Sequence, residues 1–107
     1  MSKPQCVTLP DGTKKWMMDG WLHRDDGPAV VLADGTQIWY RNGWRHREDG
    51  PALVNANGTL AWYQDGHLHR LDGPAVIRPD GSKEYWAYGR QDVENDQPPA
   101  EPIDFRM

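Results

Sequence analysis

The sequence is built on a unit of 23 residues that recurs along most of its length. Residues 29–51 read AVVLADGTQIWYRNGWRHREDGP, and residues 52–74 read ALVNANGTLAWYQDGHLHRLDGP. Residues 6–28 form an earlier copy, and residues 75–97 form a fourth copy that diverges in its second half. A fixed period of this kind is typical of a repeat protein, in which each unit buries its apolar face against its neighbours. We therefore expect a single four-unit repeat domain over residues 1–97.

Each unit carries two turn signals that divide it into strands. In the second unit, a short β-branched run is followed by Asp34-Gly35, and a longer aromatic run over residues 36–41 is followed by Asn42-Gly43. Asp-Gly and Asn-Gly favour type I′ hairpin turns, which need positive φ at both central residues. No helical periodicity is present. The sequence predicts an all-β fold, in which tandem β-hairpins form an elongated, twisted, single-layer antiparallel meander of about eight strands.

The aromatic residues of the longer strands are expected to form two rows. Alternate residues of a strand face opposite sides of a sheet, so neighbouring positions belong to different rows. One row holds Trp16, Trp39, Trp62 and Tyr85, and the other holds Met17, Tyr40, Tyr63 and Trp86. We expect these rows to form the core of the single-layer sheet, and a second interpretation, which is compatible with the first, is that one row is an exposed aromatic ladder that marks a partner site.

A second repeated group lies in the connection between units, where the sequence reads HR-x-DGP. It contains three histidines, three arginines and three aspartates: His23, His46, His69, Arg24, Arg47, Arg70, Asp26, Asp49 and Asp72. Histidine and aspartate could ligate a metal or act as acid and base. An active site is usually built once, from unlike residues, so we expect structural roles, with no catalytic residues, metal or cofactor. The arginines should pair with the aspartates, and the histidines should bond across the connection.

Composition narrows the function classes. The net charge is −4 and the mean hydropathy is −0.87, so a nucleic-acid-binding surface, which needs a basic excess, is disfavoured. Cys6 is the single cysteine, which excludes an internal disulfide. No apolar run is long enough for a signal peptide or a membrane span, and we expect a cytoplasmic protein without membrane contact. Residues 98–107 read PPAEPIDFRM and are expected to be a proline-rich tail that docks on the last hairpin or binds a partner.

A resemblance to a known family follows from these strings. NGWRH at 42–46, NGT at 57–59 and WYQDG at 62–66 resemble a variant MORN repeat, and the resemblance covers residues 6–91. It implies hairpin units stacked into an elongated twisted sheet, with scaffolding, dimerisation and protein or lipid binding as functions. Here HR-x-DGPA replaces the His-Gly step of the family. This variant is similar to repeat proteins of bacteria and their phages, which for a phage protein implies a host protein as the target, including a defence enzyme.

The leading hypothesis is a non-enzymatic module that binds a protein partner, a second copy of the chain included. The candidate partner-binding residues are the aromatic side chains of both strands and two polar neighbours: Trp21, Trp44, Tyr40, Tyr63, Trp86, Arg45 and His67. The main alternative is carbohydrate or small-ligand binding through exposed aromatic rows. Two further alternatives are a hydrolase that uses His46 and Asp49, and an acidic decoy that occupies a nucleic-acid-binding groove.

Overall fold

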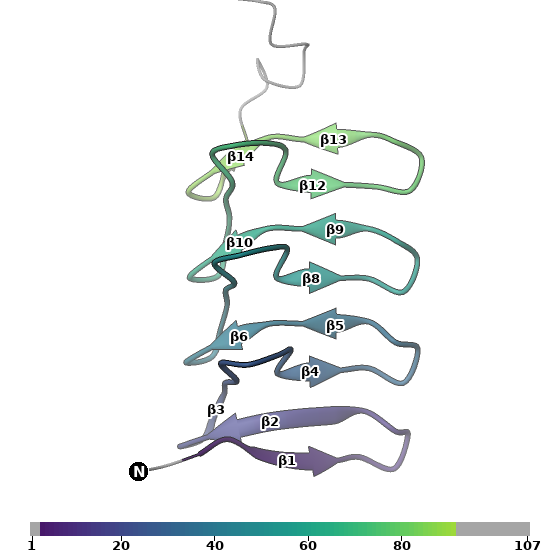
Figure 1. Ribbon diagram of the computed structural model, residues 1–107, viewed down its shortest axis with the longest axis vertical. Coiled ribbons are helices and arrows are strands. Elements are labelled where there is room, and N and C mark those ends of the chain that lie inside the picture. Colours follow the sequence, from purple (N-terminus) through teal and green to yellow (C-terminus); the bar gives the residue numbers. More distant parts are fainter. Residues whose placement is uncertain (1–2, 92–107) are drawn as a thin grey trace, which may run out of the picture.

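The computed structural model describes residues 3–91, which form an open stack of β-hairpins (Figure 1). These residues contain fifteen short strands and no helix. The first strands of the units are β1 (Gln5–Thr8), β4 (Val30–Val31), β8 (Leu53–Val54) and β12 (Val76–Ile77). The second strands are β2 (Lys14–Met18), β5 (Gln37–Ile38), β9 (Leu60–Ala61) and β13 (Lys83–Glu84). The remaining strands are β3 (Trp21–Leu22), β6 (Tyr40–Arg41), β7 (Trp44–Arg45), β10 (Tyr63–Gln64), β11 (His67–Leu68), β14 (Trp86–Ala87) and β15 (Arg90–Gln91).

The main sheet is a meander in the order β1-β2-β4-β5-β8-β9-β12-β13, and all of its pairings are antiparallel. Its register repeats with the sequence: Lys14 pairs with Val31, and Gln37, 23 residues later, pairs with Val54. Equivalent side chains of successive units therefore fall into columns. The principal extents of 51 × 31 × 17 Å fit a thin, elongated sheet that does not close into a barrel. The predicted all-β meander is confirmed.

The number of strands differs from the prediction of about eight, because the long second strand changes its partner part way along. In the second unit this happens at Trp39, whose N–H donates to the carbonyl of Ala52 in the next unit at 2.7 Å. The carbonyl of Trp39 instead accepts from the N–H of His46 in its own unit at 3.1 Å. The first half, β5, thus belongs to the main sheet, and the second half, β6, pairs with the return strand β7. The return segments form strands that pair within their own units: β3 joins the main sheet beside β2, whereas β7, β11 and β15 form separate two-stranded ladders with β6, β10 and β14.

The first turn of each unit is not the predicted type I′ turn. In the second unit the N–H of Gly35 donates to the carbonyl of Leu32, and the N–H of Leu32 donates to the carbonyl of Thr36, both at 2.9 Å. This is a three-residue loop, in which a type I turn is followed by a left-handed residue. Only the glycine has positive φ (+95°), because Asp34 occupies the ordinary region and uses its carboxylate to accept the N–H of Thr36 at 2.9 Å.

The aspartates of these first turns make stability sensitive to acid. The hydrogen bond from the backbone N–H of Thr36 is the main cause of the lowered pKa of Asp34. The equivalent bonds from the N–H groups of Thr13 and Ser82 lower the pKa of Asp11 and Asp80. A carboxyl group with a lowered folded-state pKa stabilises the fold above its ordinary pKa. That contribution is lost as the pH falls through the lowered folded-state value.

The third unit supplies the control for this effect, since Asn57 accepts the N–H of Thr59 at 2.9 Å without titrating. The triple variant Asp11→Asn, Asp34→Asn, Asp80→Asn should keep the turn geometry. We expect its melting temperature to fall less between pH 6 and pH 2 than that of the wild type, measured by circular dichroism. An equal fall in both proteins would show that these carboxylates do not carry the acid sensitivity.

The second turns do have the predicted type I′ geometry. Asn42 and Gly43 both have positive φ, at 50° and 84°, and the same pair of angles recurs at Asp19-Gly20 and Asp65-Gly66. Asparagine and aspartate tolerate this left-handed conformation better than most residues. In the fourth unit Tyr88 adopts it, with φ of 52°, although the polar turn residue has been lost from the sequence.

The core consists of small and β-branched side chains rather than aromatic ones. Ala29, Ala52 and Ala75 are completely buried, and Val30 and Ile38 are nearly so. The aromatic residues of both predicted rows are only half-buried. In a single layer no second sheet covers a large ring, whereas a small side chain between neighbouring hairpins is enclosed by backbone. The rows therefore contribute to packing, but the expectation that they form the core holds only in part.

On the β13 edge of the main sheet, a charged residue stands where the second and third units have an apolar one. Glu84 occupies the position that Ile38 and Ala61 hold in earlier units, and its carboxylate accepts the indole N–H of Trp86 at 2.8 Å and pairs with Arg78. The indole N–H and then Arg78 lower the pKa of Glu84. A charge at such a position protects an edge from pairing with other strands. The predicted tail at 98–107, like the end of the fourth unit, lies outside the described residues.

Over the described part of the chain, no helix has the length and apolar character needed to cross a membrane.

Candidate functional site

The repeated arginine links three parts of its own unit. The guanidinium carbon of Arg47 lies 3.9 Å from the ring centroid of Trp39, so the charge is stacked on the indole. Its Nε donates to Asp49 at 3.1 Å, and one terminal nitrogen donates to the carbonyl of Pro51 at 3.0 Å. Arg24 and Arg70 make the same three contacts in their units. The predicted arginine–aspartate pairs are confirmed, and each lies within one unit.

The glycine of each DGP sequence leaves room for this arginine. A Cβ atom placed on Gly50 would lie 3.0 Å from the guanidinium carbon of Arg47, closer than side-chain packing normally allows. Gly27 and Gly73 are equally close to their arginines, at 2.9 Å. Packing thus explains the arginine, aspartate and glycine of HR-x-DGP, because the guanidinium pairs with the aspartate and lies over a glycine that has no side chain.

The repeated histidine joins each unit to the next. Nδ1 of His46 accepts the backbone N–H of Asp65, and Nδ1 of His23 accepts that of Asn42, both at 3.0 Å. His69 accepts the N–H of Tyr88 at 2.9 Å in the same way. The donor is always the first positive-φ residue of a type I′ turn that lies 19 positions further along the chain. The predicted bond across the connection is confirmed.

This bond fixes the tautomer of the histidine. Because Nδ1 accepts a hydrogen bond, a neutral ring carries its hydrogen on Nε2. In His46 that atom lies 2.6 Å from the carboxylate of Glu48, and in His23 it lies 3.1 Å from Asp25. The third unit has Leu71 at this position, 74% exposed, in place of a carboxylate, and its histidine still accepts the bond from the turn. The carboxylate therefore adds to the connection without being required for it.

Three of the predicted partner-binding residues form one column on the return strands. Trp21, Trp44 and His67 each lie against the type I′ glycine of the following unit, and a Cβ on Gly43 would lie 2.4 Å from the ring of Trp21. The same distance separates a Cβ on Gly66 from Trp44. Trp21 and Trp44 remain 59% and 57% exposed. We call these three side chains the return-strand column.

The other predicted partner-binding residues are half-buried. Arg45 pairs with Tyr40 in the β6–β7 ladder, and a terminal nitrogen of Arg45 donates to the hydroxyl of Tyr63 at 3.1 Å. Burial tends to lower the pKa of Arg45, but hydrogen bonding and proximity to the two tyrosines outweigh it and raise the pKa. Arg45 thus stays charged between the two rings. Trp86 lies apart from them and donates to Glu84.

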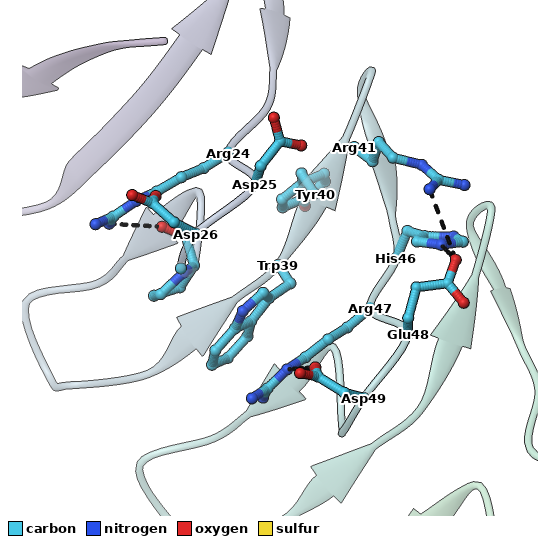
Figure 2. A pocket seen from close by; sticks show the side chains of 12 residues that line it. Arg24, Asp25, Asp26, Trp39, Tyr40, Arg41, His46, Arg47, Glu48 and Asp49 are labelled. Atoms are coloured by element: carbon cyan, nitrogen blue, oxygen red, sulfur yellow. Dashed lines mark hydrogen bonds and ion pairs between the residues drawn. The ribbon is translucent and has the colours of Figure 1, made fainter. Parts of the chain in front are cut away.

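Between successive connections the surface is hollowed into grooves. One groove, of about 630 Å³, lies between the connections of the first and second units, with Trp39 between the Arg24–Asp26 and Arg47–Asp49 pairs (Figure 2). A second groove of 630 Å³ lies one unit further along, with Trp62 in the equivalent place. Arg41 reaches Glu48 at 3.6 Å at the side of the first groove. No residue of the return-strand column lines either groove.

These grooves were missed in the sequence, although the pattern contained a signal. The variable residue in HR-x-DGP is Asp25, then Glu48, then Leu71, and in the structure all three lie on the groove walls. The spacing could have shown that an acidic residue stands at this position in the first two units. Among residues 3–91, no three side chains of His, Cys, Asp or Glu gather closely enough to hold a metal ion.

Comparisons of this chain with protein-family models, with curated proteins and with solved structures gave no match.

Proposed function

We propose that this protein is a non-enzymatic repeat module that binds a protein partner through the return-strand column. The observation that carries the proposal is the pair Trp21 and Trp44, which stand at equivalent positions and expose more than half of their surface. Each indole rests on a glycine of the next unit, so the fold fixes the rings without burying them. Fixed, exposed tryptophans are the side chains that most often dominate the energy of a protein interface.

The remaining surface supports a protein rather than a small ligand as the partner. The return-strand column runs along the stack, with rings repeating every ~9.5 Å because each unit adds two strands. Tyr88, 71% exposed, lies beside it in the last turn, with its ring 4.1 Å from that of His69. A long, flat row of this kind suits an extended interface. The resemblance to phage and bacterial MORN-type proteins extends the proposal to a host protein as the partner.

A capture experiment with matched variants tests this proposal. The wild type and the double variant Trp21→Ala, Trp44→Ala are immobilised and exposed to cell lysate, and the retained proteins are identified by mass spectrometry. We expect a partner that the wild type and Leu71→Ala retain and the double variant loses, because Leu71 is even more exposed than the two tryptophans but lies outside the column. Equal retention by all three proteins would contradict the proposal. A fluorescence change on adding glycans, absent in the double variant, would favour carbohydrate binding instead.

A further inference from the structure

The two grooves between the connections are copies of one site. Both measure 630 Å³, within the range of ligand-binding clefts, and both place a tryptophan between two arginine–aspartate pairs. The constant register of the sheet makes the copies equivalent in orientation, although the second groove has Gln64 and Leu71 where the first has Arg41 and Glu48. Such a pair can bind one ligand that presents the same group twice.

The mouth of each groove is negative, although its walls contain charges of both signs. In each connection the aspartate side chain is 86–88% exposed, whereas the arginine that pairs with it is only 25–26% exposed. The arginine is covered because it stacks on tryptophan, and the carboxylate is left at the rim. Asp25 and Glu48 add carboxylates that are 79% and 70% exposed, and the exposed carboxylates of the first groove outnumber its one further guanidinium, that of Arg41, which is 44% exposed. A ligand that approaches the groove therefore meets carboxylates and an indole, a combination that favours a cationic side chain.

The distance between the grooves restricts the backbone of the ligand. Each unit adds two strands to the main sheet, so equivalent atoms of the two grooves are about 9.5 Å apart. A polyproline II helix repeats every three residues and rises about 9.3 Å in doing so. In a β-strand, residues on one face are about 6.6 Å or 13 Å apart, and neither spacing matches.

We infer that the two grooves together bind a proline-rich segment of a partner protein that carries a basic residue at every third position. The polyproline II conformation turns residues i and i+3 to the same side, so one basic side chain enters each groove. The prolines at i+1 and i+4, which share another side of the helix, lie against Trp39 and Trp62, as apolar residues do in other aromatic-lined grooves for such ligands. This inference goes beyond the proposed function, because it concerns a different surface and names the chemistry of its partner.

Synthetic peptides test the spacing directly. The peptide PPRPPRPP has arginine at i and i+3, whereas PPRPRPPP and PPRPPPRP carry the same charge at i+2 and i+4. Binding is measured by isothermal titration calorimetry at low salt. We expect the i+3 peptide to bind about three- to tenfold more tightly than the other two, since only it places a cation in both grooves. Equal affinity of the three peptides, or no binding of any, would overturn the inference.

Protein variants assign the binding to the grooves. Glu48 already lines the second groove, and Leu71→Glu adds a further carboxylate at the position that Asp25 and Glu48 hold in their own connections. This variant should increase the affinity of the i+3 peptide about two- to fivefold. Leu71 is exposed, so this variant is not expected to disturb the fold. The double variant Asp25→Asn, Glu48→Gln removes two carboxylates but keeps an oxygen acceptor for Nε2 of each histidine. It should lower the affinity of the same peptide by a similar factor.

The control variant is Trp44→Ala, which should leave peptide affinity unchanged. Loss of peptide binding in Trp44→Ala would place the ligand on the return-strand column, and would overturn the groove assignment without affecting the proposed function. No change in affinity for Leu71→Glu and for the double variant would overturn the assignment as well.

Discussion

Replacing Gly43 with alanine is expected to lower the free energy of unfolding by about 2–5 kcal/mol, well beyond the effect of the same change at Gly20. Both glycines have φ of +84° in equivalent type I′ turns, so alanine at either should cost about 1–2 kcal/mol from the left-handed conformation. The two glycines differ in the atoms that an added Cβ would meet. Nothing lies within 4 Å of a Cβ on Gly20, whereas a Cβ on Gly43 would lie 2.4 Å from the Trp21 ring. Displacing that ring adds about 1–3 kcal/mol.

The contribution of the ring can be isolated by a double-mutant cycle. In a Trp21→Ala background, Gly43→Ala should cost no more than Gly20→Ala, because only the backbone conformation still opposes the methyl group. Urea denaturation followed by circular dichroism gives the free energies of all the variants. If Gly43→Ala and Gly20→Ala were equally destabilising in the wild-type background, Trp21 would not rest on the turn, and the rigid return-strand column would lose its basis.

The stacking of hairpins was predictable from the sequence because the repeat carries both turn signals in strict register. The turn signal Asn42-Gly43 and its copies recur every 23 residues, so equivalent residues align only if the hairpins are stacked side by side in the same register. The structure has this register. The three-residue first turn was not predicted, because Asp34-Gly35 also suits a type I′ turn. The type of this turn depends on whether Asp34 adopts positive φ, as in a type I′ turn, or accepts a hydrogen bond from the N–H of Thr36, as it does here.

The candidate sites were predictable only in part, since exposure depends on how neighbouring units meet. Trp39 and Trp44 are the same residue type five positions apart, and alternation alone does not say which ring is stacked. In the structure, the guanidinium of Arg47 stacks on Trp39. Trp44 instead lies against Gly66, and more than half of its surface is exposed. The position in HR-x-DGP that forms the groove wall looked like a variable spacer, because its role appears only when two units are placed side by side.

Replacing Trp39 with alanine is expected to lower the free energy of unfolding by about 3 kcal/mol, at the lower end of the range for tryptophan because the ring is half-buried. The same change at Trp44 should cost only about 1 kcal/mol, because most of that ring already contacts water. Trp39 also supports Arg47, whose remaining bonds to Asp49 and Pro51 hold the connection between units. Loss of the ring therefore weakens the connection as well as removing apolar contact.

The coupling between ring and arginine is measurable with Arg47→Ala and the double variant with Trp39→Ala. We expect the two single changes to sum to about 0.5–1 kcal/mol more than the double change, the magnitude of an exposed cation–π contact. Urea denaturation supplies the four free energies, and the capture assay supplies partner binding. Trp44→Ala should weaken partner binding with little change in stability, and Trp39→Ala should do the reverse at temperatures where it stays folded. If both variants lost stability equally and bound the partner equally well, the tryptophans would have one structural role, and the distinction between a stacked ring and a binding ring would fail.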